Sequence, residues 1–370
     1  MITRRLLFLN GLAAIGVILN HAAAWGFVAM FWWAHRYLPV SSPNFDQMGG
    51  ASYYALRFIE QLIAFSIPAF LFVSGYFVSF SARGSTNRIN LTFVWDRVKY
   101  IVVPYLVWAL LTILADAIQG TSFTALEVVR SLILGQAAPA FYFVPLLVQL
   151  YSLSPILVRW AKRSWPTLVG IAGAMQVVAH LIRYARVFSL GSSIPDPIQL
   201  IGAGWFFPGN IAWFVLGIVI GLYIDRFGPF LTRIRWSMLV ATVLLLPLGI
   251  AEWEFLLHTS GQAWIAPMET LVDNAYSLTL LLAFFGFTWL PTWASKPIGA
   301  LGSKSYGIYL VHSIVLVVVA RIVYHVLPGL LGWQLAFQAV LIAAGLGVPL
   351  ALMWVVRASP ARRLYPILFG

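Results

Sequence analysis

The chain has 370 residues, of which 61% are hydrophobic and 9% charged, and this excludes an ordinary soluble protein because soluble domains carry about 25% charged residues. The formal net charge is +12, but the Lys and Arg residues form no basic stripe interleaved with aromatic residues, which argues against nucleic-acid binding. Because there is no Cys, thiol nucleophiles, disulfides and Cys-type metal sites are excluded, and any chemistry must use His, carboxylates or hydroxyls.

Ten apolar segments approach or exceed the roughly 20 residues that a helix needs to cross a bilayer. They cover residues 6–33, 54–81, 98–118, 141–160, 165–183, 205–224, 235–256, 268–290, 305–326 and 333–357. We therefore predict an all-α fold, a polytopic membrane bundle of about ten helices, with residues 1–370 forming a single transmembrane domain. Segment 141–160 contains Pro145 and Pro155, so we expect it to be kinked or partly re-entrant.

The Lys and Arg residues indicate how the bundle is oriented. An even number of spans places both termini on one side of the membrane. If that side is the cytoplasm, most of the 23 Lys and Arg residues are cytoplasmic, as the positive-inside rule requires. The exceptions are Arg36, Arg57, Arg130, Arg183, Arg186 and Arg321.

The N-terminal segment also fits a secretory signal peptide. Arg4 and Arg5 precede an apolar stretch that ends in three alanines at residues 22–24, which resembles a small-residue cleavage site. The apolar run continues to Trp33, however, and this gives the segment the length of a membrane span. We therefore favour a retained first helix.

Asn10 and His21 share one face of this first helix. At about 100° per residue, the eleven steps between them amount to three turns plus about 20°, a separation of about 16 Å. His21 would lie in the outer half of the hydrocarbon core, roughly 22 Å from a start near residue 6. An ionisable side chain at this depth indicates a functional site, although its position alone is equally compatible with a neutral imidazole bonded between helices.

Ser305, Tyr309 and His312 lie within SKSYGIYLVHS at spacings of four and three, so they share one face of the ninth span. His312 would lie about 10 to 14 Å from the cytoplasmic end. Two hydroxyls and an imidazole on one membrane face predict the wall of a polar cavity. The alternative is that they only hydrogen-bond neighbouring helices together.

Arg97 and Lys99 begin the third span, in WDRVKYIVVPYLVW. Such residues commonly set topology and extend to the interface. The functional alternative is a clamp for the phosphates of an anionic ligand, which suits arginine geometry. We find no P-loop and no metal-ligand cluster.

The other polar positions are interpreted structurally. Arg57 and Glu60 are three residues apart and placed to neutralise each other, and Ser74-Gly75 predicts close helix packing or a kink. Five acidic residues are expected to face water near the interface, with binding of a polar substrate as the alternative. They are Asp116, Glu252, Glu254, Glu269 and Asp273.

Several stretches together resemble acyltransferase family 3, the bacterial integral-membrane acyltransferases that modify cell-surface glycans. They are LNGLAAIGVILNHA, SIPAFLFVSGYFVSF, DRVKYIVVPYLVW, FYFVPLLVQLYSLSPIL and SKSYGIYLVHSIVL. The blocks occur in family order from residue 9 to about residue 316. Each block alone is weakly specific, whereas the ordered set is considerably more specific.

The resemblance implies an enzyme in the bacterial cytoplasmic membrane that takes an acyl group, expected to be acetyl, from cytoplasmic acyl-CoA. A hydroxyl of a glycan, lipid-linked glycan or similar acceptor would receive it, with no bound cofactor and no metal. The family's first-span His matches His21, its IYL-x-H block matches Tyr309 and His312, and its basic residue at the third span matches Arg97. The family commonly has Arg eleven residues before the first-span His, where this chain has Asn10.

We therefore expect His21 to act as general base, because an imidazole titrates near neutral pH. Arg97 and Lys99 would bind the CoA phosphates, Asn10 would line the donor path, and Ser305, Tyr309 and His312 would orient the reacting groups. His21 and His312 should flank one cavity that opens toward Arg97 and Lys99. The main alternative is a transporter or flippase with His21 or His312 as proton relay, and a further one is an inactive scaffold.

Overall fold

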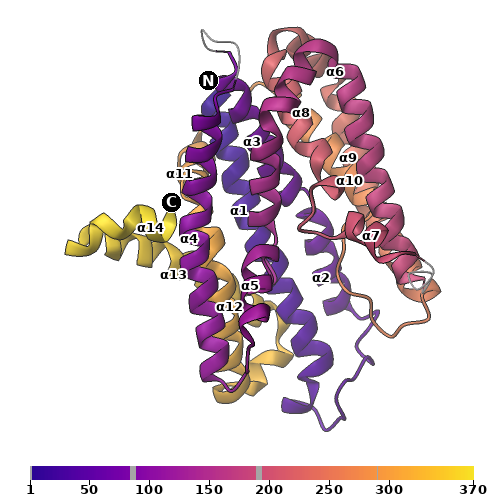
Figure 1. Ribbon diagram of the computed structural model, residues 1–370. Helices are drawn as coiled ribbons and strands as arrows, with labels where there is room; N and C mark the ends of the chain where they lie inside the picture. Colours follow the sequence, from indigo (N-terminus) through magenta and orange to yellow (C-terminus); the bar gives the residue numbers. More distant parts are fainter. Residues whose placement is uncertain (1, 84–88, 189–193, 290) are drawn as a thin grey trace.

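Figure 1 shows the computed structural model, which describes residues 2–83, 89–188, 194–289 and 291–370. Arg88, which the topology prediction places in the cytoplasm, lies outside these ranges. The described residues form helices and no strand, so the all-α prediction is confirmed. The α-helices are α1 (Ile2–Phe27), α2 (Ala51–Leu62), α3 (Ser66–Ser81), α4 (Leu91–Ile118), α5 (Ala125–Leu134), α6 (Phe143–Val187), α7 (Asp196–Gln199), α8 (Ile211–Leu222), α9 (Ile224–Thr259), α10 (Leu271–Gly286), α11 (Thr292–Gly302), α12 (Ser305–Val326), α13 (Gln334–Ala358) and α14 (Tyr365–Phe369).

Seven helical segments in the described part of the chain are long and apolar enough to cross a membrane, and α8 and α10 are shorter apolar helices. The 45-residue α6 is divided by Ser164, whose backbone angles of φ −158° and ψ 84° are not helical. Together these helices cover all ten predicted segments. The protein is thus a polytopic helical membrane protein, while the number of crossings and the side of the termini stay predictions.

Two breaks interrupt the bundle in its interior. Residues 63–65 separate α2 from α3, and the Tyr276 hydroxyl donates to the Leu62 carbonyl there, at 2.8 Å. Residues 135–142 separate α5 from α6, and Gly135 ends α5 in the left-handed region with φ 68°, a conformation that glycine adopts without strain. The Tyr105 hydroxyl donates to the Leu132 carbonyl near this break, at 2.7 Å.

α5 lies beside one half of α4, and the chain continues from there into α6 (Figure 1). The irregular residues between α5 and α6 reach α4 and α12, where Phe141 packs against Tyr105 and Tyr309. We expect a kink or a partly re-entrant course within 141–160, but α6 is helical from Phe143 up to the kink at Ser164, and the irregular backbone precedes it, at residues 135–142.

Glycines allow α3 and α8 to pack backbone against backbone. A Cβ added to Gly75 would overlap the Phe214 carbonyl, and one added to Gly217 would overlap the Phe72 carbonyl. The interpretation of Ser74-Gly75 as a close-packing position is therefore confirmed. Small residues at such positions are the usual means by which membrane helices approach closely.

We predict that Gly217→Ala destabilises the protein by about 1–3 kcal/mol, because the new methyl group must push α3 away from α8. Gly170→Ala is the matched control, since a Cβ there meets no atom within 4 Å and alanine favours a helix by up to about 1 kcal/mol. Thermal unfolding of both variants in detergent checks this. Equal unfolding temperatures for the two variants would contradict the packing argument.

Candidate active site

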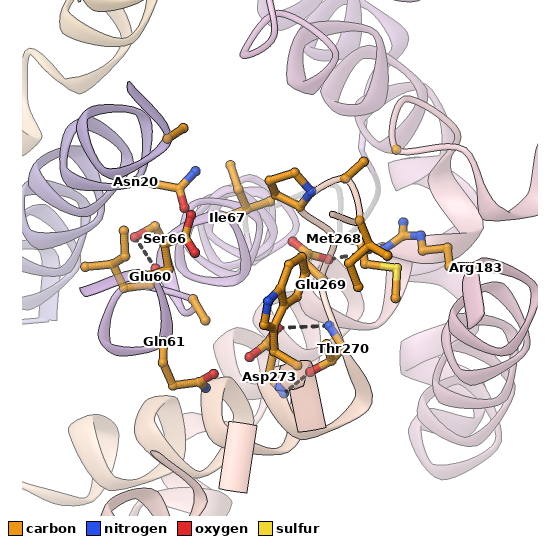
Figure 2. Close-up of a pocket in the computed structure, with 18 of the residues that line it drawn as sticks. Asn20, Glu60, Gln61, Ser66, Ile67, Arg183, Met268, Glu269, Thr270 and Asp273 are labelled. Atoms are coloured by element: carbon orange, nitrogen blue, oxygen red, sulfur yellow. Dashed lines mark hydrogen bonds and ion pairs between the residues drawn. The ribbon is translucent and has the colours of Figure 1, made fainter. Parts of the chain in front are cut away.

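A cavity of about 740 Å³ lies in the half of the bundle remote from the N-terminus. Figure 2 shows Asn20, Glu60 and Ser66 on one side of it and Arg183 and Glu269 on the other. The lining comes from α1, α2, α3, α6, α9, α10 and α12 and from the connecting segments at residues 63–64, 139–142, 202–210 and 262–270. Under the predicted topology, this is the side away from the cytoplasm.

His21 lines this cavity, and His312 packs behind it with the two ring centroids 5.2 Å apart. His312 is completely buried. Its Nδ1 lies 2.6 Å from the Tyr309 carbonyl oxygen, and its Nε2 has no hydrogen-bond partner. Because a carbonyl only accepts, Nδ1 carries the proton and Nε2 presents a free lone pair.

Tyr309 joins this histidine pair to the broken backbone between α5 and α6. Its hydroxyl donates to the Ala140 carbonyl, and its ring lies 5.9 Å from that of His312. Tyr309 and Ala140 both line the cavity. The structure thus brings His21, Tyr309 and His312 together across α1 and α12.

Ser305 lies on the other side of the histidine pair, in a narrow gap between α1, α3 and α12. Phe70, Ile308 and His312 also border this gap, which has no room for a water molecule. Ile308 and Ile18 pack against Phe369 of α14, so apolar side chains close this side of the site.

Arg97 and Lys99 are exposed near the start of α4. The Arg97 guanidinium lies 5.3 Å from the centre of the Phe93 ring. No residue of α4 lines the large cavity, so the expected opening from His21 toward Arg97 and Lys99 is not seen. The cause is the filled gap around Ser305 and Phe70.

Asn10 lies on α1 outside the large cavity, and its Oδ1 is buried without a hydrogen-bond partner. Arg5 does not take the place of the family's arginine. It donates to the carbonyls of Phe284 and Phe287, both at 2.5 Å, where a cation stabilises the C-terminal end of α10. Arg5 lies sixteen residues before His21, and at 100° per residue this turns it about 160° away from the His21 face.

A polar network that the sequence pattern does not predict lies on the far wall of the cavity. Arg183 Nη1 lies 3.6 Å from Glu269 Oε2, and His180 Nε2 lies 3.9 Å from the same oxygen. Asn274 donates to His180 Nε2 at 2.7 Å. The expectation that Glu269 and Asp273 face bulk water is wrong, because both line the cavity. Their spacing of four residues at the start of an apolar segment was the available signal.

Arg57 and Glu60 form the predicted ion pair, with Nη1 and Oε2 2.7 Å apart. The Arg57 guanidinium also lies 4.0 Å from the ring centre of Trp253 and 4.5 Å from that of Phe27. Cation–π contacts of this kind stabilise a buried arginine. Within the described ranges, no cluster of three His, Asp or Glu side chains could hold a metal ion.

Comparison with known proteins identifies the family. A family model described as an acyltransferase domain, that of acyltransferase family 3, matches residues 6–356. The chain belongs to acyltransferase family 3. As a member of this family with many apolar helices, it is a membrane acyltransferase.

Two relatives of this acyltransferase carry different functional names. The "Probable poly-beta-1,6-N-acetyl-D-glucosamine export protein" of Staphylococcus aureus is 22% identical over 280 residues, which cover 73% of this chain and 74% of the relative. The "Putative membrane-bound acyltransferase YfiQ" of Bacillus subtilis is 24% identical over 265 residues, which cover 70% and 69%. No solved structure matches the chain.

The buried carboxyl of Glu269 should make the stability of the protein depend on pH. Burial raises the pKa of this carboxyl above its ordinary 4.5, and Arg183 opposes the rise only in part. Between 4.5 and the raised value, the folded protein keeps a proton that the unfolded chain has lost, so stability falls as pH increases. Glu269→Gln has no carboxyl to lose this proton. Its unfolding temperature should therefore rise relative to that of the wild type as the pH increases from 4.5 to the raised pKa. A difference that does not change with pH would contradict the prediction.

Proposed function

We propose that this acyltransferase transfers an acyl group, most simply acetyl, from acyl-CoA to a hydroxyl of a cell-envelope glycan or a similar acceptor, with His21 as general base. One observation carries the proposal. His21 lies on the wall of a cavity large enough for a sugar unit and packs against a second imidazole whose free nitrogen is fixed in position.

His21 would take the proton of the acceptor hydroxyl as the oxygen attacks the thioester carbonyl. The new C–O bond forms while the C–S bond breaks, and the proton then passes from His21 to the leaving CoA sulfur. His312 Nε2 can accept a hydrogen bond from the His21 ring and so stabilise the imidazolium, the role that a carboxylate has in a catalytic triad. A covalent acyl-His21 intermediate is the alternative route.

The donor would come from the side opposite to the cavity. Arg97 and Lys99 lie at the predicted cytoplasmic end and would bind the CoA phosphates, while Asn10 and Ser305 would line the path of the pantetheine arm. The filled gap beside His312 must then widen to admit the thioester. Acceptor and donor would meet at His21 from opposite sides of a bacterial cytoplasmic membrane, with both termini in the cytoplasm.

Export of a glycan is the second candidate function. The name of the S. aureus relative and the broken helices around the cavity favour it, because transporters build their sites from discontinuous helices. His21 or His312 would then relay protons. The name of the B. subtilis relative and the family itself favour acyl transfer, so we place transfer first.

His21→Ala should lower acyl-CoA turnover by 10²–10⁴, the usual contribution of a general base. Release of CoA by purified protein in nanodiscs, with and without glycan acceptors, measures this. His258→Ala is the matched control, because His258 is exposed on α9 outside the cavity. Full turnover by His21→Ala would remove His21 from the proposed role, and glycan export by a variant without turnover would favour the transporter.

Arg97→Gln and Lys99→Gln should raise KM for acyl-CoA more than they lower kcat, because they remove binding that is equal in the ground and transition states. Arg321→Gln, at the opposite end of the bundle on α12, is the control. An unchanged KM in both test variants would show that the phosphates are bound elsewhere.

A further inference from the structure

Buried hydrogen-bond donors without acceptors gather where α2 and α9 meet at the cavity. Arg57 is only 5% exposed, and its Nε and Nη2 make no hydrogen bond. The Trp253 Nε1, also a donor, has no partner either. Both residues line the cavity and are in contact with each other. A native protein seldom leaves buried donors unpaired, so this group indicates a ligand that supplies acceptor oxygens.

The free nitrogens of Arg57 form one complete edge of the guanidinium. Glu60 binds Nη1, on the other side of the group, and the rings of Trp253 and Phe27 hold the guanidinium. The Nε–Nη2 edge has the geometry that binds the two oxygens of a carboxylate or phosphate in parallel. Both nitrogens are shielded from solvent. A ligand must therefore displace some of the side chains that surround the guanidinium when it binds.

The formal charges of the cavity lining balance, with Arg57, Arg183 and Arg186 against Glu60, Glu269 and Asp273. An anionic ligand is therefore indicated by the unpaired donors of Arg57 and Trp253. Glu60 pairs with Arg57, and Asp273 accepts from the Thr270 backbone at the start of α10. Glu269 Oε2 lies 3.6 Å from Arg183 Nη1 and makes no hydrogen bond.

The distance from Arg57 to His21, the proposed general base, also suits a single ligand that reaches both residues. Its guanidinium lies over Phe27, which is six residues beyond His21 on α1 and therefore about 9 Å further along the helix. A ligand that reaches both residues presents a hydroxyl at one point and an anionic group at another, as a uronic acid unit or a sugar phosphate does.

We propose that the acceptor is an anionic glycan and that Arg57, with Trp253, binds its carboxylate or phosphate group. This inference rests on the proposed function, because it takes the cavity to be the acceptor site. It adds the chemical class of the acceptor and a binding residue that the transfer chemistry itself does not require.

Direct binding tests the inference without the reaction. The probes are glucuronate, glucose 1-phosphate and neutral glucose, titrated by calorimetry into protein in phosphatidylcholine nanodiscs. We expect wild type and His21→Ala to bind at least one anionic sugar about tenfold more tightly than glucose, the ratio expected for a charged hydrogen-bonded pair. The preferred probe distinguishes a carboxylate from a phosphate acceptor.

Two variants assign the binding to the proposed residues. Arg57→Lys keeps the charge but loses the two-donor edge, and Trp253→Phe keeps a ring but loses the N–H, so each should weaken anion binding, Arg57→Lys about tenfold. Arg36→Lys is the matched control, since Arg36 also stacks on an aromatic ring, that of Tyr324, but lies outside the cavity. If Arg57→Lys does not fold, Trp253→Phe decides.

The inference is overturned if the anionic sugars bind no better than glucose, if they do not bind, or if folded Arg57→Lys and Trp253→Phe retain wild-type affinity. Its failure is distinct from failure of the proposed function. CoA release that depends on His21 can persist with a neutral acceptor, and anion binding by His21→Ala can persist without any acyl transfer.

Discussion

Tyrosine hydroxyls satisfy the backbone groups that the broken helices leave unpaired, and the site depends on this constraint. A free carbonyl in hydrocarbon costs several kcal/mol. Tyr276 binds the carbonyl at the end of α2, Tyr105 binds one near the end of α5, and Tyr309 binds that of Ala140 in the following break. At the N-terminus of α10 a tyrosine hydroxyl is instead the acceptor, since the Leu271 N–H donates to the Tyr184 hydroxyl at 2.7 Å. Irregular backbone can therefore line a cavity deep in the bundle.

Tyr309 connects this constraint to the chemistry. It holds the break next to the cavity, and its own backbone carbonyl fixes the Nδ1 proton of His312, three residues later. One residue of α12 thus sets both the cavity wall and the tautomer of the imidazole behind His21. Tyr309 acts here as a positioning residue, since its hydroxyl is committed to Ala140.

Spacing along single helices was the part of the site that the sequence could predict. The placement of Asn10 and His21, and of Ser305, Tyr309 and His312, follows from helical geometry, and so does the Arg57–Glu60 pair. The contact between His21 and His312 depends on how α1 packs against α12, which no local pattern encodes. Glu269 and Asp273 were misplaced because a charged residue next to an apolar segment normally faces water. Here the loop before α10 turns inward, and the Glu269 carboxylate of this loop lies close to Arg183.

The closed gap behind His312 has an electrical consequence. The cavity admits polar groups as far as His21, whereas the gap between His312 and the N-terminal half of the bundle holds no water. A membrane voltage falls mainly across such a dry layer, and moving one elementary charge through it is worth about 2.3 kcal/mol per 100 mV. A proton that reaches His21 from the cavity side crosses little of this field, while one that arrives from the donor side crosses most of it. Whenever a voltage is present across the membrane, the free energy of protonating His21 therefore depends on the side from which the proton comes.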